Sequence, residues 1–119
     1  IIINEKMIEN VRHLEPIFMG GLKNFEDLEF IGESRGIGLM GALEMVQDKK
    51  NKLPFDGSIS IGERVANKCI ENGLICRPLG PSIVLCPPFI TSEEEMGIIF
   101  DTLEKTLKEV FSEVKSLGQ

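Results

Sequence analysis

The sequence has no tryptophan, no tyrosine and a single histidine, His13, among its 119 residues. Its three cysteines, Cys69, Cys76 and Cys86, include no Cys-x-x-Cys pair of the kind that zinc and redox sites use. These shortages predict that the chain has no metal site. We expect His13 on a helix surface, the cysteines as reduced core residues and the protein in the cytoplasm. Cys76 and Cys86 could also face one another across a hairpin, but we favour a core role for them.

Basic residues are also scarce, since 13 Lys and Arg stand against 19 Asp and Glu, for a formal net charge of −6. Nucleic acids and anionic membranes bind proteins through clustered basic side chains, so neither is expected as a partner. No apolar run approaches the length of a membrane span, and no signal peptide is recognisable. The length predicts one domain with one core. Because the sequence begins with three isoleucines and no methionine, we interpret it as part of a longer chain.

Apolar residues at helical spacing predict three helices. The first begins near Asn4 and contains Pro16, which predicts a kink or a break. The second begins at Ser60, where Glu63 completes a capping-box pattern, and is followed by Gly73, which suits the left-handed position after a helix.

The third helix is the longest and begins at Thr91, with Glu94 completing a second capping-box pattern. The acidic triplet 93–95 falls in its first turn, where it complements the helix dipole, so we do not interpret it as a metal site. The second and third helices are predicted to bury these residues: Ile61, Val65, Ala66, Cys69 and Ile70, and then Ile98, Ile99, Leu103, Leu107, Val110, Phe111 and Val114.

Strands are predicted in two pairs. Residues 28–34 and 37–46 form the first pair, and "LICR" (74–77) and "SIVLC" (82–86), joined by the turn "PLGP", form the second. With helices before, between and after these pairs, the sequence predicts an α+β fold of two layers, with a largely antiparallel sheet and helices on one face. Mixed pairing around the central helix is the alternative left open here.

One motif matches the dinucleotide-binding fingerprint, because Gly36, Gly38 and Gly41 have the spacing G-x-G-x-x-G. That fingerprint needs an apolar strand before it and a helix beginning inside it. Here the residues before it are only half apolar, and those after it alternate as a mostly buried strand does. We therefore predict that these glycines lie in a strand pair where backbones approach closely, with no nucleotide.

Arg77 is the one side chain that the local pattern places at a well-fixed backbone position. It ends an apolar strand and precedes a turn stiffened by proline. An arginine held this way can grip a carboxylate with two parallel hydrogen bonds. The alternative is an arginine at a strand end that reaches solvent.

Two segments together resemble a known family: "GESRGIGLMGALEMVQDKK" (32–50) and "NGLICRPLGPSIVLCPPFITSEEEMGIIFDTLEKTL" (72–107). They are similar to the C-terminal part of class III pyridoxal-phosphate-dependent aminotransferases, and most similar to the omega-amino acid or amine:pyruvate branch. The resemblance covers nearly the whole chain and implies that residues 1–119 are the C-terminal small domain of such an enzyme. It also implies that the glycine-rich stretch forms strands of the small domain.

The resemblance implies roles for two residues. Arg77 matches the mobile arginine that binds the substrate α-carboxylate in the amine:pyruvate branch and swings away for an apolar amine. Leu79 matches a residue near the substrate pocket. The full enzyme would be a homodimer that transfers an amino group from an amine or omega-amino acid to pyruvate or a similar keto acid, with pyridoxal 5′-phosphate as cofactor.

The residues that hold this cofactor in the family, including the Schiff-base lysine, lie in a large domain that this sequence does not include. The chain alone is therefore expected to be inactive and to contain no catalytic residue. The following lysines fall in a polar loop or on predicted helix surfaces, where nothing would lower the pKa of an amine: Lys49, Lys50, Lys52, Lys68, Lys105, Lys108 and Lys115. Two alternatives stay open, namely another class III member, such as an aminomutase or an ornithine-type aminotransferase, and a free-standing α+β ligand-binding module.

Overall fold

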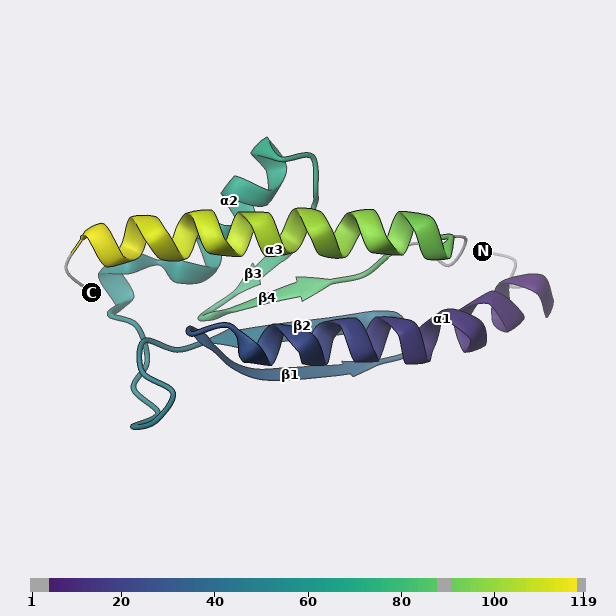
Figure 1. The fold of residues 1–119 in the computed structure, drawn as a ribbon, viewed down its shortest axis with the longest axis horizontal. Coiled ribbons are helices and arrows are strands. Elements are labelled where there is room, and N and C mark those ends of the chain that lie inside the picture. The colour runs from purple at the N-terminus through teal and green to yellow at the C-terminus, as the bar shows by residue number, and fades with distance from the viewer. Residues whose placement is uncertain (1–4, 88–90, 118–119) are drawn as a thin grey trace.

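A computed structural model describes residues 5–87 and 91–117 (Figure 1). Within these ranges the chain forms α1 (Glu5–Asn24), the 3-10 turn η1 (Phe25–Asp27), β1 (Ile31–Ile37), β2 (Met40–Met45), the 3-10 turn η2 (Gly57–Ile59), α2 (Ile61–Glu71), β3 (Arg77–Leu79), β4 (Ser82–Leu85) and α3 (Glu93–Ser116). The predicted order of helices and strands is confirmed. No helix among the described residues is both long and apolar enough to cross a membrane.

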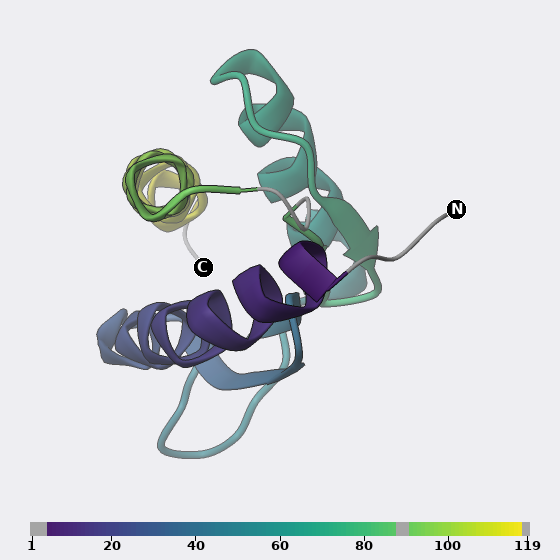
Figure 2. The same ribbon diagram turned by 90° about the vertical axis from the view of Figure 1, so that its right-hand side faces the viewer.

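The four strands of the described chain form one sheet in the order β1-β2-β4-β3, and every neighbouring pair is antiparallel. The alternative of mixed pairing around the central helix is therefore wrong. The three helices lie on the same side of this twisted sheet, with α3 in contact with both α1 and α2 (Figure 2). The two-layer α+β prediction, with helices on one face, is confirmed. The opposite face, which we name the open face, carries no helix.

The core lies between the sheet and the helices. Successive side chains of a strand point to opposite faces, so alternate residues of β2 and β4 face the helices. The buried residues include Leu43 and Met45 of β2, Ile83 and Leu85 of β4, Phe18 and Leu22 of α1, and Leu103, Leu107 and Val110 of α3. Each such side chain contributes about 1.5–3 kcal/mol when it leaves water completely.

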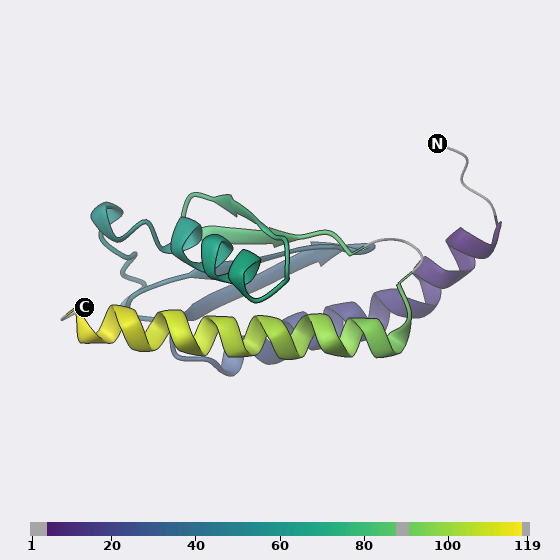
Figure 3. The same ribbon diagram turned by 90° about the horizontal axis from the view of Figure 1, so that it is seen from above.

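The α1 helix is continuous across Pro16, so the predicted break is absent. Proline has no N–H to donate to the carbonyl of Arg12, four residues earlier, and this loss lets a helix bend without ending. Figure 3 shows α1 bent along its length, with its C-terminal part beside α3.

Both predicted capping boxes need correction. Ser60 does precede α2, but its backbone is left-handed (φ 50°) and its side chain caps nothing in the helix, because it points back to the carbonyl of Gly57, 3.4 Å away. At α3 the box is shifted by one residue. Ser92 accepts a hydrogen bond from the Glu95 backbone N–H at 3.1 Å, and Glu95 accepts one from the Ser92 N–H at 3.0 Å.

Two residues predicted to be buried are exposed. Ile70 of α2 and Ile98 of α3 are each 60% exposed, because the buried stripe of each helix is narrower than its apolar stripe. The other end of α2 is as predicted. Gly73 has φ 87° and donates its N–H to Ile70, while Leu74 donates to Cys69, which together form a Schellman motif.

The glycine-rich motif forms a strand pair and a tight turn, as predicted. Gly36 of β1 lies opposite Gly41 of β2, and Gly38 begins the two-residue turn between them with φ 57°. A Cβ on Gly41 would lie 2.3 Å from Leu22 Cδ1 and 3.0 Å from the ring of Phe18. Glycine at position 41 thus lets α1 pack directly on the sheet.

Candidate functional site

Arg77 is the first residue of β3, not the last residue of a strand as predicted. The apolar residues before it, 74–76, lie outside the sheet, because the pairing of β3 with β4 begins at Arg77 and Val84. The strand instead contains Pro78, which an edge strand tolerates because one side of its backbone has no neighbour. Arg77 therefore sits at the margin of the sheet, on backbone fixed by pairing with Val84.

The side chain of Arg77 belongs to the open face. Paired residues share a face, so the register places Arg77, Val84, Ala42 and Arg35 in one row across the four strands. Two arginines thus lie three strand spacings apart, about 14 Å at the backbone.

These two arginines differ in their partners. The guanidinium of Arg35 lies 3.5 Å from a carboxylate oxygen of Glu33 and 3.7 Å from one of Glu44. Arg77 is exposed and, among the side chains that the structure describes, no carboxylate comes within 4.0 Å of it. Arg77 is therefore free to bind a carboxylate from outside the described chain.

Leu79 lies on the same face, two residues after Arg77, and is 67% exposed. Other large apolar side chains near this face are exposed too, with Ile37 at 78%, Met40 at 55% and Ile75 at 82%. Arg77 also lines an open hollow of about 430 Å³ between the start of β3 and the end of β4. The structure thus brings the two predicted site residues together on a face that combines one unpaired cation with apolar surface.

Cys76 anchors the backbone immediately before Arg77. It is 6% exposed, and its thiol is hydrogen-bonded to that of Cys69, which is fully buried in α2. This bond, reinforced by burial, raises the pKa of Cys76 far above its usual range, so its thiol stays protonated. The same bond, with help from Thr106, lowers the pKa of Cys69. The prediction of core cysteines is confirmed for Cys69 and Cys76 and is wrong for Cys86, which is exposed and lies beyond the end of β4.

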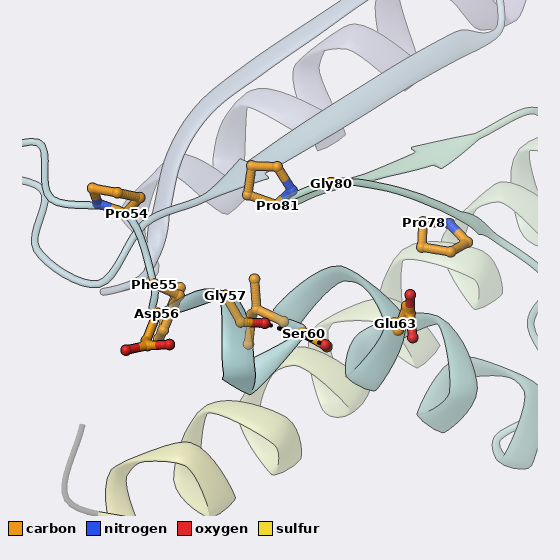
Figure 4. Close-up of a pocket in the computed structure, with 10 residues that line it drawn as sticks. Pro54, Phe55, Asp56, Gly57, Ser60, Glu63, Pro78, Gly80 and Pro81 are labelled. Atoms are coloured by element: carbon orange, nitrogen blue, oxygen red, sulfur yellow. Dashed lines mark hydrogen bonds between the residues drawn. The ribbon is translucent and has the colours of Figure 1, made fainter.

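The turn after Leu79 holds the other end of β3. Gly80 has φ 58° and begins a two-residue turn that Pro81 completes, as in a type II′ hairpin. The helix side of this turn faces the first turn of α2 across a pocket of about 410 Å³ (Figure 4). Pro78 and Pro81 line it from the hairpin, and Ser60 and Glu63 line it from α2.

Sequence reasoning overlooked one residue at this contact, Gly62 of α2. A Cβ on Gly62 would lie 2.3 Å from the carbonyl oxygen of Gly80 and 3.1 Å from that of Ser82. A signal was present in the sequence, since glycine inside a helix costs about 1 kcal/mol relative to alanine and usually marks a packing requirement.

The remaining titratable groups do not form a second site in the described chain. His13 is on the surface of α1, as predicted, with Nε2 3.5 Å from Glu93. Within residues 5–87 and 91–117 no cluster of three His, Cys, Asp or Glu side chains could hold a metal ion. The lysines named above are exposed, except for half-buried Lys68, which lies 3.6 Å from Glu109 and 3.9 Å from Glu113.

The sequence profile of the family described as Aminotransferase class-III matches residues 1–107. Among curated relatives, the adenosylmethionine-8-amino-7-oxononanoate aminotransferase of Methanocaldococcus jannaschii is 37% identical over 105 residues, which are 88% of this chain and 23% of the relative.

Solved structures share both sequence and fold with the chain. The PMP-bound form of an aminotransferase from Vibrio fluvialis is 57% identical, with a TM-score of 0.91, and the match covers 95% of this chain and 25% of that one. An omega-aminotransferase from Paracoccus denitrificans is 58% identical, with a TM-score of 0.90, over 94% of this chain and 25% of its own. The chain spans about a quarter of the length of the proteins that it resembles.

Proposed function

Because this chain belongs to the class III aminotransferases, we propose that residues 1–119 form the C-terminal small domain of an enzyme that transfers an amino group from an amine or omega-amino acid to pyruvate or a similar keto acid. The observation that carries the proposal is the state of Arg77, which is exposed, fixed at its backbone and unpaired among the described side chains. The branch is supported by the 58% identity to a protein described as an omega-aminotransferase.

Arg77 would bind the carboxylate of the keto acid. A guanidinium offers two parallel N–H donors to a carboxylate, and such charged hydrogen bonds are about twice as strong as neutral ones. The exposed apolar side chains of Leu79 and Ile75, close to Arg77 in the chain, would offer contact area to an apolar amine. When such an amine binds, the arginine must turn toward solvent, because a buried charge without a partner costs several kcal/mol.

Class III aminotransferases use pyridoxal phosphate, which carries the amino group between the two substrates. The residues of this chain do not fit the role of holding it. A lysine that forms a covalent bond to a carbonyl needs a desolvated amine, and the described lysines are exposed or, like Lys68, paired with carboxylates. We therefore assign cofactor binding to the part of the enzyme outside this chain, and we expect the chain alone to be inactive.

The open face of the sheet is the surface that would meet this missing part. It presents Ile37, Met40 and Leu79 to solvent, and exposed apolar groups gathered on one face are typical of a contact surface. The proposed partner is the enzyme's own large domain, within a homodimer. We place the enzyme in the cytoplasm, where the three cysteines would remain the free thiols that the structure shows.

The test is Arg77→Ala in the full-length enzyme. We expect the half-reaction with pyruvate or alanine to lose about ten- to a hundredfold in kcat/KM, because a hydrogen bond to a charged group contributes about 1.5–3 kcal/mol. The half-reaction with an apolar amine that has no carboxylate should change less than about threefold. Single-turnover kinetics of the two half-reactions separate these effects.

Arg77→Lys provides a matched variant, since it keeps the charge and removes the planar fork. It should recover part of the carboxylate half-reaction and leave the amine half-reaction unchanged. Equal losses in both half-reactions of Arg77→Ala would show that the arginine supports structure and would refute the carboxylate role.

A further inference from the structure

Two backbones meet where α2 approaches the β3–β4 turn. The position that a Cβ of residue 62 would take lies 2.3 Å from the Gly80 carbonyl oxygen, far inside the ordinary contact distance between these atom types. The opposing group is main chain, and main chain in a tight turn cannot move aside as the end of a flexible side chain can. Only glycine at position 62 allows α2 and the turn to approach as they do in Figure 4.

The contact lies at the turn of a hairpin whose outer strand, β3, is short. β3 has three residues and pairs with β4 alone, and Pro78 in its middle has no backbone N–H to donate. On its helix side the turn faces the first residues of α2 and the segment before it across a pocket, and the carbonyl of Pro81 accepts a hydrogen bond from the Met45 N–H of β2 at 3.0 Å. The absence of a side chain at Gly62 sets how closely the turn approaches α2.

A displacement of the turn would also displace the backbone of Arg77, because the two are close along the chain. Gly80 directly follows β3 and is three residues from Arg77, a span of about 10 Å at most. Paired strands move as units, because their hydrogen bonds fix the spacing of the backbone. An added methyl group at position 62 would force the two backbones apart by about 1 Å, and an error of this size in a positioned group can lower a rate about a hundredfold.

We propose that Gly62 is a positioning residue for the substrate carboxylate: by seating the β3–β4 turn directly on α2, it places the guanidinium of Arg77 where the carboxylate binds. This proposal rests on the proposed function of Arg77. Gly62 touches neither substrate nor cofactor and acts through the hairpin.

The test compares Gly62→Ala with Gly97→Ala in the full-length enzyme. Both glycines lie in helices, but a Cβ at position 97 would meet nothing within 4 Å. The control therefore adds the same methyl group to a helix without pressing it against another backbone. For Gly62→Ala we expect kcat/KM with pyruvate to fall about ten- to a hundredfold, mainly through KM, while the half-reaction with an apolar amine changes less than about threefold. Gly97→Ala should match the parent enzyme in both half-reactions.

A double variant shows whether Gly62 acts through the arginine. In an Arg77→Ala background, Gly62→Ala should cause no further selective loss with pyruvate, since nothing is left to misplace. Should Gly62→Ala fail to fold, Pro81→Gly loosens the same turn from the opposite side, and its smaller loss, about three- to tenfold, should again be selective for the carboxylate substrate.

The outcomes are distinguishable. Equal losses in both half-reactions of Gly62→Ala, or selective losses that persist in the Arg77→Ala background, overturn the positioning role and leave the role of Arg77 intact. If Arg77→Ala itself causes no selective loss, the proposed function fails and the positioning role fails with it.

Discussion

The β1–β2 hairpin has strands of seven and six residues, whereas the β3–β4 hairpin has strands of three and four. The long hairpin is held to α1 along its length. Gly41 lets Leu22 and Phe18 pack on it, and the carboxylate of Glu15 accepts a hydrogen bond from the Gly38 N–H at 2.7 Å. The short hairpin meets α2 at its turn, where the backbone of Gly62 lies against the carbonyls of Gly80 and Ser82.

The arginines on the two hairpins also differ in how firmly their side chains are held. Arg35 on the long hairpin is held by two carboxylates, whereas Arg77 on the short hairpin has no such partner among the described side chains. The comparison suggests a division of roles, in which the long hairpin stabilises the domain and the short hairpin presents the arginine that we propose binds and releases substrate. The following substitutions test this division, from the largest expected effect on stability to the smallest.

Gly41→Val should have the largest effect on stability. Its new side chain would overlap Leu22 and Phe18, and overpacking of this kind costs about 1–3 kcal/mol. The measurement is the denaturant midpoint of the full-length enzyme. The matched control is Gly20→Val, since a Cβ at this exposed position of α1 would meet nothing within 4 Å, and it should change the free energy of unfolding by less than about 0.5 kcal/mol. An unchanged midpoint for Gly41→Val would mean that the packing of α1 against Gly41 does not stabilise the long hairpin.

Gly38→Ala and Gly80→Ala should cost similar amounts of stability. Each glycine begins a two-residue turn with positive φ, 57° and 58°, and a Cβ would meet nothing within 4 Å at either position. The expected cost is about 1–2 kcal/mol for each, from backbone strain alone. The close strand packing predicted for Gly38 is therefore wrong, although its positive φ still requires glycine there. Asparagine tolerates positive φ better than alanine, so Gly38→Asn and Gly80→Asn should both recover part of the loss. A clear inequality between the two turns would contradict the strain account.

Arg35→Ala should have the smallest effect. Its ion pairs are more than one-third exposed on both sides, and pairs of this kind contribute about 0.2–1 kcal/mol. Catalytic constants with pyruvate and with an apolar amine should both stay within about twofold of the parent, in contrast to Arg77→Ala. A carboxylate-selective loss in Arg35→Ala would mean that the open face as a whole, not Arg77 in particular, attracts the substrate.

Much of the fold follows from local sequence signals. The order of elements, the left-handed Gly73, the Gly38 turn and the buried alternation of β2 depend on residues that are close in sequence. Arg77 and Leu79 were assigned to the site from their place in a family motif, and the structure adds that they share one face and that Arg77 has no described ionic partner.

The wrong predictions concern features that depend on contacts between residues far apart in the sequence. The start of β3 is set by where it pairs with β4, which the local apolar pattern does not reveal, so Arg77 was placed at the wrong end of its strand. The exposure of Ile70 and Ile98 depends on the width of the helix contacts, which periodicity does not reveal. At Ser60 the preceding 3-10 turn sets a left-handed backbone, which directs the hydroxyl away from the helix. The role of Gly62 requires knowing which turn lies against α2.

The two margins of the sheet also bear on how the chain behaves at high concentration. A strand with one unpaired side can add a strand from another molecule and begin aggregation. At the β3 margin, Pro78 has no N–H to offer such a strand. At the β1 margin, an irregular register between Ile31 and Glu33 interrupts the regular spacing that an incoming strand would need, and Glu33 and Arg35 add charge. Each margin thus resists intermolecular β-pairing by its own means, proline on the short side and irregularity with charge on the long side.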